Sequence, residues 1–197
     1  MIVSALQMIN GDYEFGYVGS AIGLALIYIV VQSRIIAEAN VRAEMYSALS
    51  TTDVLTGLKN RRAYNESLSA LAAVGRVGVV FCDINSLKTV NDTISHDEGD
   101  ALIRRFALLL ASSFPDGNAF RISGDEFTVL FPEPDEADFP ERMRAFADRL
   151  RKNDRIASFG WAVGEGQDAQ QLVRDAEQQM HLDKDEYYRV TGRQRRC

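Results

Sequence analysis

The chain has 197 residues, of which 46% are hydrophobic, and a formal net charge of −6 at pH 7. This length accommodates one ordinary domain and a small additional segment. The acidic balance lacks the basic footprint of nucleic-acid-binding proteins, so we expect no nucleic-acid partner. The two cysteines, Cys82 and Cys197, indicate no disulfide framework and fit a reducing compartment.

An uncharged run covers residues 15–31 and, with Gln32 and Ser33, reaches the length of a membrane-spanning helix. We predict an N-terminal segment, residues 1–33, that contains a transmembrane helix over about 15–33. Acidic residues precede the run and basic residues follow it, which places its C-terminal side in the cytoplasm: Asp12, Glu14, Arg34 and Arg42. The run lacks the basic flank of a signal peptide. A buried helix of a soluble protein is the alternative interpretation.

Residues 34–52 are predicted to form a helical linker, because positions 35–50 contain neither Gly nor Pro. Ile35, Arg42 and Leu49 share one heptad position, but this seam is imperfect and short. A coiled coil that joins two protomers and a single solvated helix both remain open.

Residues 53–197 are predicted to form one α+β domain, with helices against an antiparallel sheet. The predicted helices cover 61–73, 85–91, 98–113, 141–152 and 169–188, and the predicted strands cover 77–83, a hairpin over 120–131, and 156–163. The strand 77–83 is apolar on both faces, which is typical of a central strand.

Two acidic stretches, residues 81–92 and 120–131, carry the candidate chemistry. The second is predicted to be a hairpin with Ser-Gly-Asp-Glu at its tip, where Gly124 supplies a positive φ. If this hairpin pairs beside the strand that ends at Asp83, then Asp83, Asp125 and Glu126 converge. Oxygen ligands without His or Cys suit Mg²⁺, with Mn²⁺ as an alternative, and such a site points towards nucleotide phosphates.

These stretches resemble the GGDEF domain of diguanylate cyclases, over roughly residues 51–190. Residues 53–62 resemble the family motif D-x-L-T-G-L-x-N-R-R, and Asn91-Asp92 with His96 and Gly99-Asp100 resembles its N-D…G-H…G-D run. Lys184 lies in a late helix where the family carries a lysine. The resemblance implies a palm-like, ferredoxin-like fold.

The resemblance also implies an activity: two GTP molecules condense into cyclic di-GMP and two pyrophosphates in a homodimer that holds one GTP per protomer. With the predicted membrane helix, the protein would lie in the inner (cytoplasmic) membrane with its catalytic domain in the cytoplasm. By resemblance, the metal ligands are Asp83, Asp125 and the carbonyl of Ile84. Asp125 and Glu126 are the catalytic pair, with Glu126 assisting the metal or the activation of the hydroxyl.

The resemblance assigns substrate binding to further positions: Asn91, Asp100, Leu87, Lys88, Gly124 and Lys184. Asn91 and Asp100 match the guanine-reading pair, because an amide and a carboxylate complement the base edge. Helix capping is the alternative role for both. Lys184 would neutralise the triphosphate as a point charge.

The sequence departs from the family pattern at several positions. Ser123 replaces the first glycine of the signature, from which we expect reduced rather than abolished activity. Other departures are Asn85 for a second acid, Leu87 for a common Phe, Ser95 for a Gly, and Tyr187-Tyr188 near the place of an arginine. An inhibitory R-x-x-D product site would fall at residues 114–117, which read Phe-Pro-Asp-Gly. We therefore predict no product inhibition through that site.

Two other functions remain open. A catalytically inactive GTP-binding domain with a regulatory role is favoured by Ser123 alone. The third possibility is an unrelated palm-type nucleotidyltransferase or nucleotide cyclase that acts on ATP.

Overall fold

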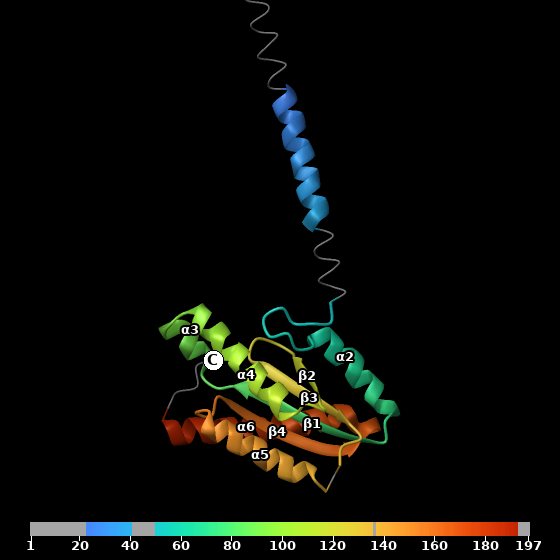
Figure 1. Ribbon diagram of the computed structural model, residues 1–197, viewed down its shortest axis with the longest axis vertical. Helices are drawn as coiled ribbons and strands as arrows, with labels where there is room; N and C mark the ends of the chain where they lie inside the picture. The colour runs from blue at the N-terminus through green and yellow to red at the C-terminus, as the bar shows by residue number, and fades with distance from the viewer. Residues whose placement is uncertain (1–22, 41–49, 136, 193–197) are drawn as a thin grey trace, which may run out of the picture. The chain divides into compact units, whose positions relative to one another are not determined.

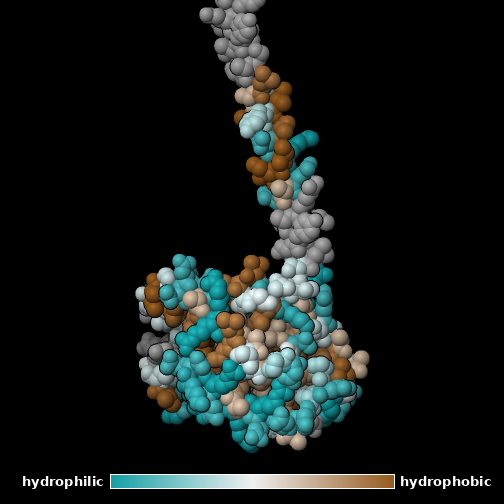
Figure 2. Space-filling model, in the orientation of Figure 1, coloured by the Kyte–Doolittle hydropathy of each residue, from teal (hydrophilic) through white to brown (hydrophobic). Residues whose placement is uncertain are grey.

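The computed structural model describes residues 23–40, 50–135 and 137–192. The chain divides into two units, residues 1–50 and 51–197. In the first unit, Gly23–Asn40 is one helix with a mean hydropathy of 1.2 and no buried residue, long and apolar enough to cross a membrane. Figure 2 shows hydrophobic side chains exposed along it, among them Leu24, Ile27 and Ile29. The predicted membrane helix over 15–33 and the linker over 34–52 extend in part outside the described residues.

The second unit contains a four-stranded antiparallel sheet in the order β2-β3-β1-β4 (Figure 1). The strands are β1 (Arg76–Ile84), β2 (Asn118–Arg121), β3 (Glu126–Pro132) and β4 (Ala157–Glu165). The prediction that the doubly apolar strand is central is confirmed, because β1 pairs with both β3 and β4. The predicted α+β, ferredoxin-like class is also confirmed.

Helices cover both faces of this sheet. They are α2 (Arg61–Ala70), α3 (Leu87–Thr93), α4 (His96–Ser113), α5 (Phe139–Lys152) and α6 (Ala169–Thr191), with short 3₁₀ turns at Leu71–Ala73 and Gly166–Asp168. Alternate residues of β1 divide between the two cores, as the two-residue period of a strand requires. Val80 and Cys82 pack with α4 and α5, whereas Val79 and Phe81 pack with α2 and α6.

Helix α6 lies directly on β4, and Gly160 makes this contact possible. A Cβ atom at Gly160 would lie 2.1 Å from the carbonyl oxygen of Ala176, a separation that no side chain tolerates. The close approach fixes the path of α6 across the sheet. As a result, the last turns of α6 reach the end of β1, where Asp83 lies.

Candidate functional site

The end of β1 and the tip of the hairpin come together as the sequence suggested. Asp83 is directly opposite Glu126 in the register of β1 and β3, and the Ile84 N–H donates a 3.0 Å hydrogen bond to the Asp125 carbonyl. Three carboxylates therefore share one small region. Mutual repulsion between them favours a bound cation.

Lys184 of α6 supplies a positive charge at this point. Its ammonium forms a hydrogen-bonded ion pair with Asp83 Oδ1, and each residue is only 7% exposed. Burial raises the pKa of Asp83 to about 6; the hydrogen bond from Lys184 opposes this rise, and the charges of Asp125 and Glu126 add to it. In this structure Lys184 therefore neutralises Asp83, a predicted metal ligand. The sequence analysis had assigned Lys184 to the triphosphate alone.

The donor set fits a hard divalent cation. No group of three or more His, Cys, Asp or Glu side chains forms a ready metal site within residues 23–40, 50–135 and 137–192. The ligand set implied by the family resemblance, the carboxylates of Asp83 and Asp125 with the carbonyl of Ile84, stays a prediction. Such oxygens suit Mg²⁺, which commonly keeps several water ligands and uses one or two carboxylates.

A pocket of about 70 Å³ adjoins these carboxylates, and it brings together Asp125, Leu87, Lys88 and Lys184. Three further lining residues, Ser86, Thr89 and Tyr188, were not assigned to the site in the sequence analysis. Ser86 has a φ of 61°, and its N–H donates a 3.3 Å hydrogen bond to the Tyr188 hydroxyl. The available signal was the spacing of Tyr188, four residues after Lys184 on one face of α6.

The hairpin tip differs from the expected conformation. Gly124 does not have the predicted positive φ; among the described glycines only Gly57 and Gly192 do. A Cβ at Gly124 would meet no atom within 4 Å, so this side of the tip is open. Ser123 also lies outside the left-handed region and donates a 2.6 Å hydrogen bond to Glu126 Oε2. A serine is therefore accommodated here without backbone strain.

The loop that contains the motif over residues 53–62 is connected to the hairpin tip by hydrogen bonds. Asp53 accepts hydrogen bonds from the N–H and hydroxyl of Thr56 at 2.9 and 2.6 Å, and from Arg121 at 3.2 Å. The Arg121 guanidinium also donates to the Gly124 carbonyl at 2.9 Å. Although partial burial opposes ionisation, the bonds from Thr56 and Arg121 lower the pKa of Asp53. Arg121 thus joins the 53–62 loop to the tip.

The two predicted guanine-reading residues lie close together in the fold. Asn91 of α3 packs against Gly99 of α4, the neighbour of Asp100, and a Cβ at Gly99 would lie 1.8 Å from Asn91 Oδ1. This oxygen is buried and lacks a hydrogen-bond partner among the described residues. Ser95 caps α4, since its hydroxyl accepts the Glu98 N–H at 3.2 Å. Helix α4 consequently begins two residues before its predicted start.

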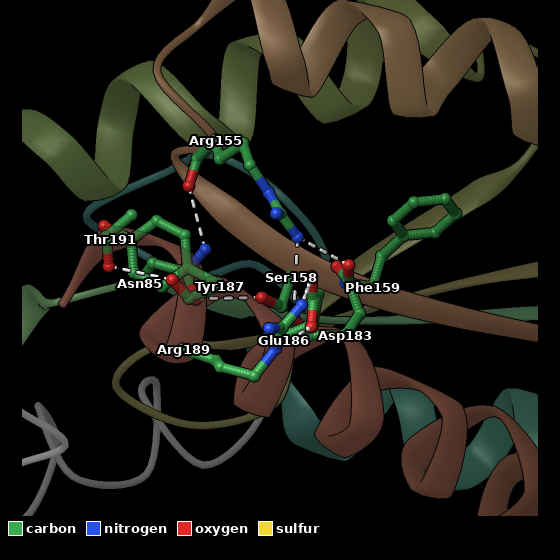
Figure 3. Close-up of polar contacts among 9 residues, drawn as sticks. All are labelled: Asn85, Arg155, Ser158, Phe159, Asp183, Glu186, Tyr187, Arg189 and Thr191. Atoms are coloured by element: carbon green, nitrogen blue, oxygen red, sulfur yellow. Dashed lines mark hydrogen bonds and ion pairs between the residues drawn. The ribbon is translucent and has the colours of Figure 1, made fainter. Parts of the chain in front are cut away.

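Asn85, which replaces an expected acid, has a structural role in this protein. It is 4% exposed; its Nδ2 donates to the Arg155 carbonyl at 2.8 Å, and its Oδ1 accepts from Ser158 at 3.0 Å (Figure 3). Arg155 in turn binds Asp183 Oδ1 at 2.7 Å, and Asp183 Oδ2 accepts the Phe159 N–H at 3.1 Å. These contacts fasten α6 to β4 immediately before Lys184.

Residues 114–117, where an inhibitory product site would fall, form part of the core and its edge. Phe114 is 1% exposed and packs against Phe131 and Phe146. Asp116 forms a two-pronged ion pair with Arg142 at 2.9 and 2.5 Å, and the hydrogen bonds from Arg142 lower the pKa of Asp116.

Known proteins share this sequence pattern and fold. The family model described as "Diguanylate cyclase, GGDEF domain" matches residues 50–188. The diguanylate cyclase VdcA of Vibrio cholerae is 35% identical over 117 residues, 57% of this chain and 34% of that protein. The cyclic di-GMP phosphodiesterase PdeR of Escherichia coli is 30% identical over 183 residues, 86% of this chain and 28% of that protein. This chain thus spans about a third or less of the length of either relative.

Among solved structures, the GGDEF domain of DgcB from Caulobacter crescentus, in complex with c-di-GMP, has the same fold with a TM-score of 0.62. It is 24% identical, and the match covers 70% of this chain and 91% of that one. The family match includes all four strands of the sheet, the hairpin tip and the Lys184 region of α6. With the carboxylates gathered where β1 meets that hairpin, this chain belongs to the GGDEF domain family of diguanylate cyclases.

Proposed function

We propose that this chain is a diguanylate cyclase that condenses two GTP molecules into cyclic di-GMP and releases two pyrophosphates. The observation that carries the proposal is the convergence of Asp83 with Asp125 and Glu126, beside a pocket lined by Lys88 and Lys184. Carboxylates for a metal next to cations for phosphates are what phosphoryl transfer requires, because catalysis there depends on positioning and charge neutralisation.

Each residue has a role in this proposal. Asp83, Asp125 and the Ile84 carbonyl would hold Mg²⁺, or Mn²⁺ in its place. When bound, the ion would polarise the α-phosphate and lower the pKa of the attacking hydroxyl. Glu126 assists the metal or the activation of that hydroxyl. Asn91 and Asp100 bind guanine.

The phosphates lie against Leu87, Lys88 and Lys184, and the open side of Gly124 admits the nucleotide. Tyr188 is a further phosphate-binding residue in this proposal. Its oxygen accepts the Ser86 N–H, so its own proton is left to donate to a phosphate oxygen.

The reaction requires two nucleotides that face each other, so the active form is a homodimer with one GTP per protomer. The 3′-oxygen of each GTP attacks the α-phosphorus of the other, the bond to pyrophosphate breaks, and the hydroxyl proton leaves. In this proposal the membrane helix predicted over about residues 15–33 anchors the protein in the inner membrane, with the catalytic domain in the cytoplasm. The length and apolar character of the helix Gly23–Asn40 support this anchor.

A second candidate is a GTP-binding domain without activity. The hydrogen bond from Ser123 to Glu126 favours it, since it occupies one oxygen of a proposed catalytic side chain. The unstrained conformation of Ser123 and the intact cluster of carboxylates favour the cyclase.

The deciding experiment incubates the full chain, in mild detergent, with GTP and Mg²⁺ and separates the products by chromatography. Cyclic di-GMP that disappears in Asp125→Ala supports the cyclase. Tight GTP binding without product supports the inactive domain. A product formed from ATP in place of GTP would refute both and favour an adenine-specific nucleotidyltransferase.

A further inference from the structure

Lys184 lies between two places that both attract a positive charge. Its ammonium is paired with Asp83, and its side chain also lines the pocket that contains Lys88, Ser86 and Tyr188. One ammonium cannot fully satisfy a buried carboxylate and a bound triphosphate together. From its position, the Lys184 ammonium can therefore bind either Asp83 or the phosphates, but not both fully.

The backbone around Lys184 is held firmly, so this choice concerns the side chain alone. The preceding residue, Asp183, binds both the Arg155 guanidinium and the Phe159 N–H (Figure 3). A cation–π contact of 5.7 Å between Arg155 and the Tyr187 ring adds to this anchor on the next turn. The four-carbon stem of a lysine can redirect its charge without any movement of α6.

The charges around Asp83 determine how strongly the free protein binds a metal ion there. Asp83 is buried and close to the charges of Asp125 and Glu126, and Lys184 is the cation that is hydrogen-bonded to it. A divalent ion that approaches Asp83 is repelled by this ammonium and competes with it for the same carboxylate. Metal binding without nucleotide therefore requires that the ion pair between Lys184 and Asp83 be broken.

We propose that Lys184 is an exchangeable counter-ion of Asp83. The Asp83 carboxylate becomes available to the metal only when a nucleoside triphosphate draws the Lys184 ammonium into the phosphate pocket. This rests on the proposed nucleotide site. Metal and triphosphate then bind with positive coupling, and each raises the affinity of the other by the same factor. A nucleoside monophosphate, with less charge to attract Lys184, produces less of this coupling.

The test measures Mn²⁺ binding to the full chain in detergent, without nucleotide, by the electron paramagnetic resonance of free Mn²⁺. With both proteins at the same pH, Lys184→Met removes the charge that competes for Asp83 and binds Mn²⁺ at least about fivefold more tightly than the wild type. Lys184→Gln, which keeps a hydrogen-bond donor for Asp83, shows the same direction. Lys88→Met removes an equal charge from the same pocket and changes the affinity much less.

Unchanged or weaker Mn²⁺ binding in both Lys184 variants, or a tightening in Lys88→Met as large as theirs, overturns the proposal. A second arm measures the affinity for 3′-deoxy-GTP, which cannot react, with Mg²⁺ and with EDTA. The affinity with Mg²⁺ divided by the affinity with EDTA should be smaller for Lys184→Met than for the wild type. Free nucleotide chelates Mg²⁺ equally in both experiments, so this effect cancels when the two proteins are compared. The Mn²⁺ measurement without nucleotide does not depend on catalysis. Absence of cyclic di-GMP would therefore refute the proposed cyclase activity, whereas the Mn²⁺ affinities alone decide whether Lys184 competes with the metal.

Discussion

The Ser123 hydroxyl donates a 2.6 Å hydrogen bond to the carboxylate of Glu126, three residues further along the same hairpin. A hydrogen bond to a charged group typically contributes about 1.5–3 kcal/mol. Because Glu126 has a proposed catalytic role, this bond keeps one of its oxygens from the substrate. Ser123→Gly should therefore raise kcat several-fold, up to about tenfold, with little change in the KM for GTP. Ser123→Thr, which retains a hydroxyl, is the control and should stay near the wild type. A fall in kcat for Ser123→Gly would show instead that Ser123 orients Glu126.

Arg121 joins two segments that are distant in sequence, the 53–62 loop and the hairpin tip, and its side chain is only 14% exposed. Arg121→Ala leaves Asp53 half-buried without its cation and frees the Gly124 carbonyl. We expect a loss of about 1–3 kcal/mol in the free energy of unfolding by urea, together with a reduced kcat. Arg121→Lys should restore little, because a lysine cannot bridge both partners. Arg62→Ala removes an exposed pair with Glu66 and is the matched control, with an expected loss below about 1 kcal/mol.

The pH dependence of stability follows from the raised pKa of Asp83, about 6 against an ordinary value of 3.8. Between these values the native state binds this proton and the unfolded state does not. The contribution of Asp83 is therefore fully present below pH 3.8 and is lost as the pH rises through about 6. In EDTA, the unfolding free energy of the wild type minus that of Asp83→Asn should fall across this window and level off above it. Urea titrations at several pH values measure this difference, and a rise with pH would contradict the assignment.

Much of the fold could be predicted because its signals are local. The doubly apolar pattern of β1 indicated a central strand, and the helices began and ended near their predicted limits. The early start of α4 was missed because the capping hydroxyl of Ser95 was treated only as a departure from the family pattern. The prediction of a positive φ at Gly124 was wrong because it assumed a tight hairpin turn, whereas the tip has another geometry, in which Arg121 donates a hydrogen bond to the Gly124 carbonyl.

The candidate site was predictable to the level of which residues meet, since the register of β1 and β3 brings Asp83 opposite Glu126. The partner of Lys184 was not predictable. The two members of the pair lie 101 residues apart, and the direction of a flexible lysine depends on the buried charges around it. The amide contacts of Asn85 were missed for the same reason, because they depend on the loop before β4.

Cyclic di-GMP should not inhibit the proposed cyclase activity through residues 114–117. Phe114 is committed to the core, and a Cβ at Gly117 would lie 2.5 Å from a methyl group of Val129. Neither position can present a side chain to a ligand, and Asp116 is already bound to Arg142. Initial rates measured with added micromolar cyclic di-GMP should match those without it. Inhibition that persists in Arg142→Ala would place a product site elsewhere, whereas inhibition lost in that variant would contradict this prediction.

Asn85→Asp converts this position to the acid that is common in the family, and we expect it to harm this protein. The new carboxylate cannot donate to the Arg155 carbonyl, and it would lie buried against that oxygen in place of a 2.8 Å hydrogen bond. We expect a loss of about 1–3 kcal/mol in the free energy of unfolding, since a buried acceptor loses its donor and a charge is added. Ser158→Ala, which removes only the hydroxyl that donates to Asn85 Oδ1, should cost less. Because Arg155 also holds Asp183 next to Lys184, the variant should weaken GTP binding as well as stability. An Asn85→Asp protein that is as stable as the wild type would show that the loop before β4 does not depend on this amide.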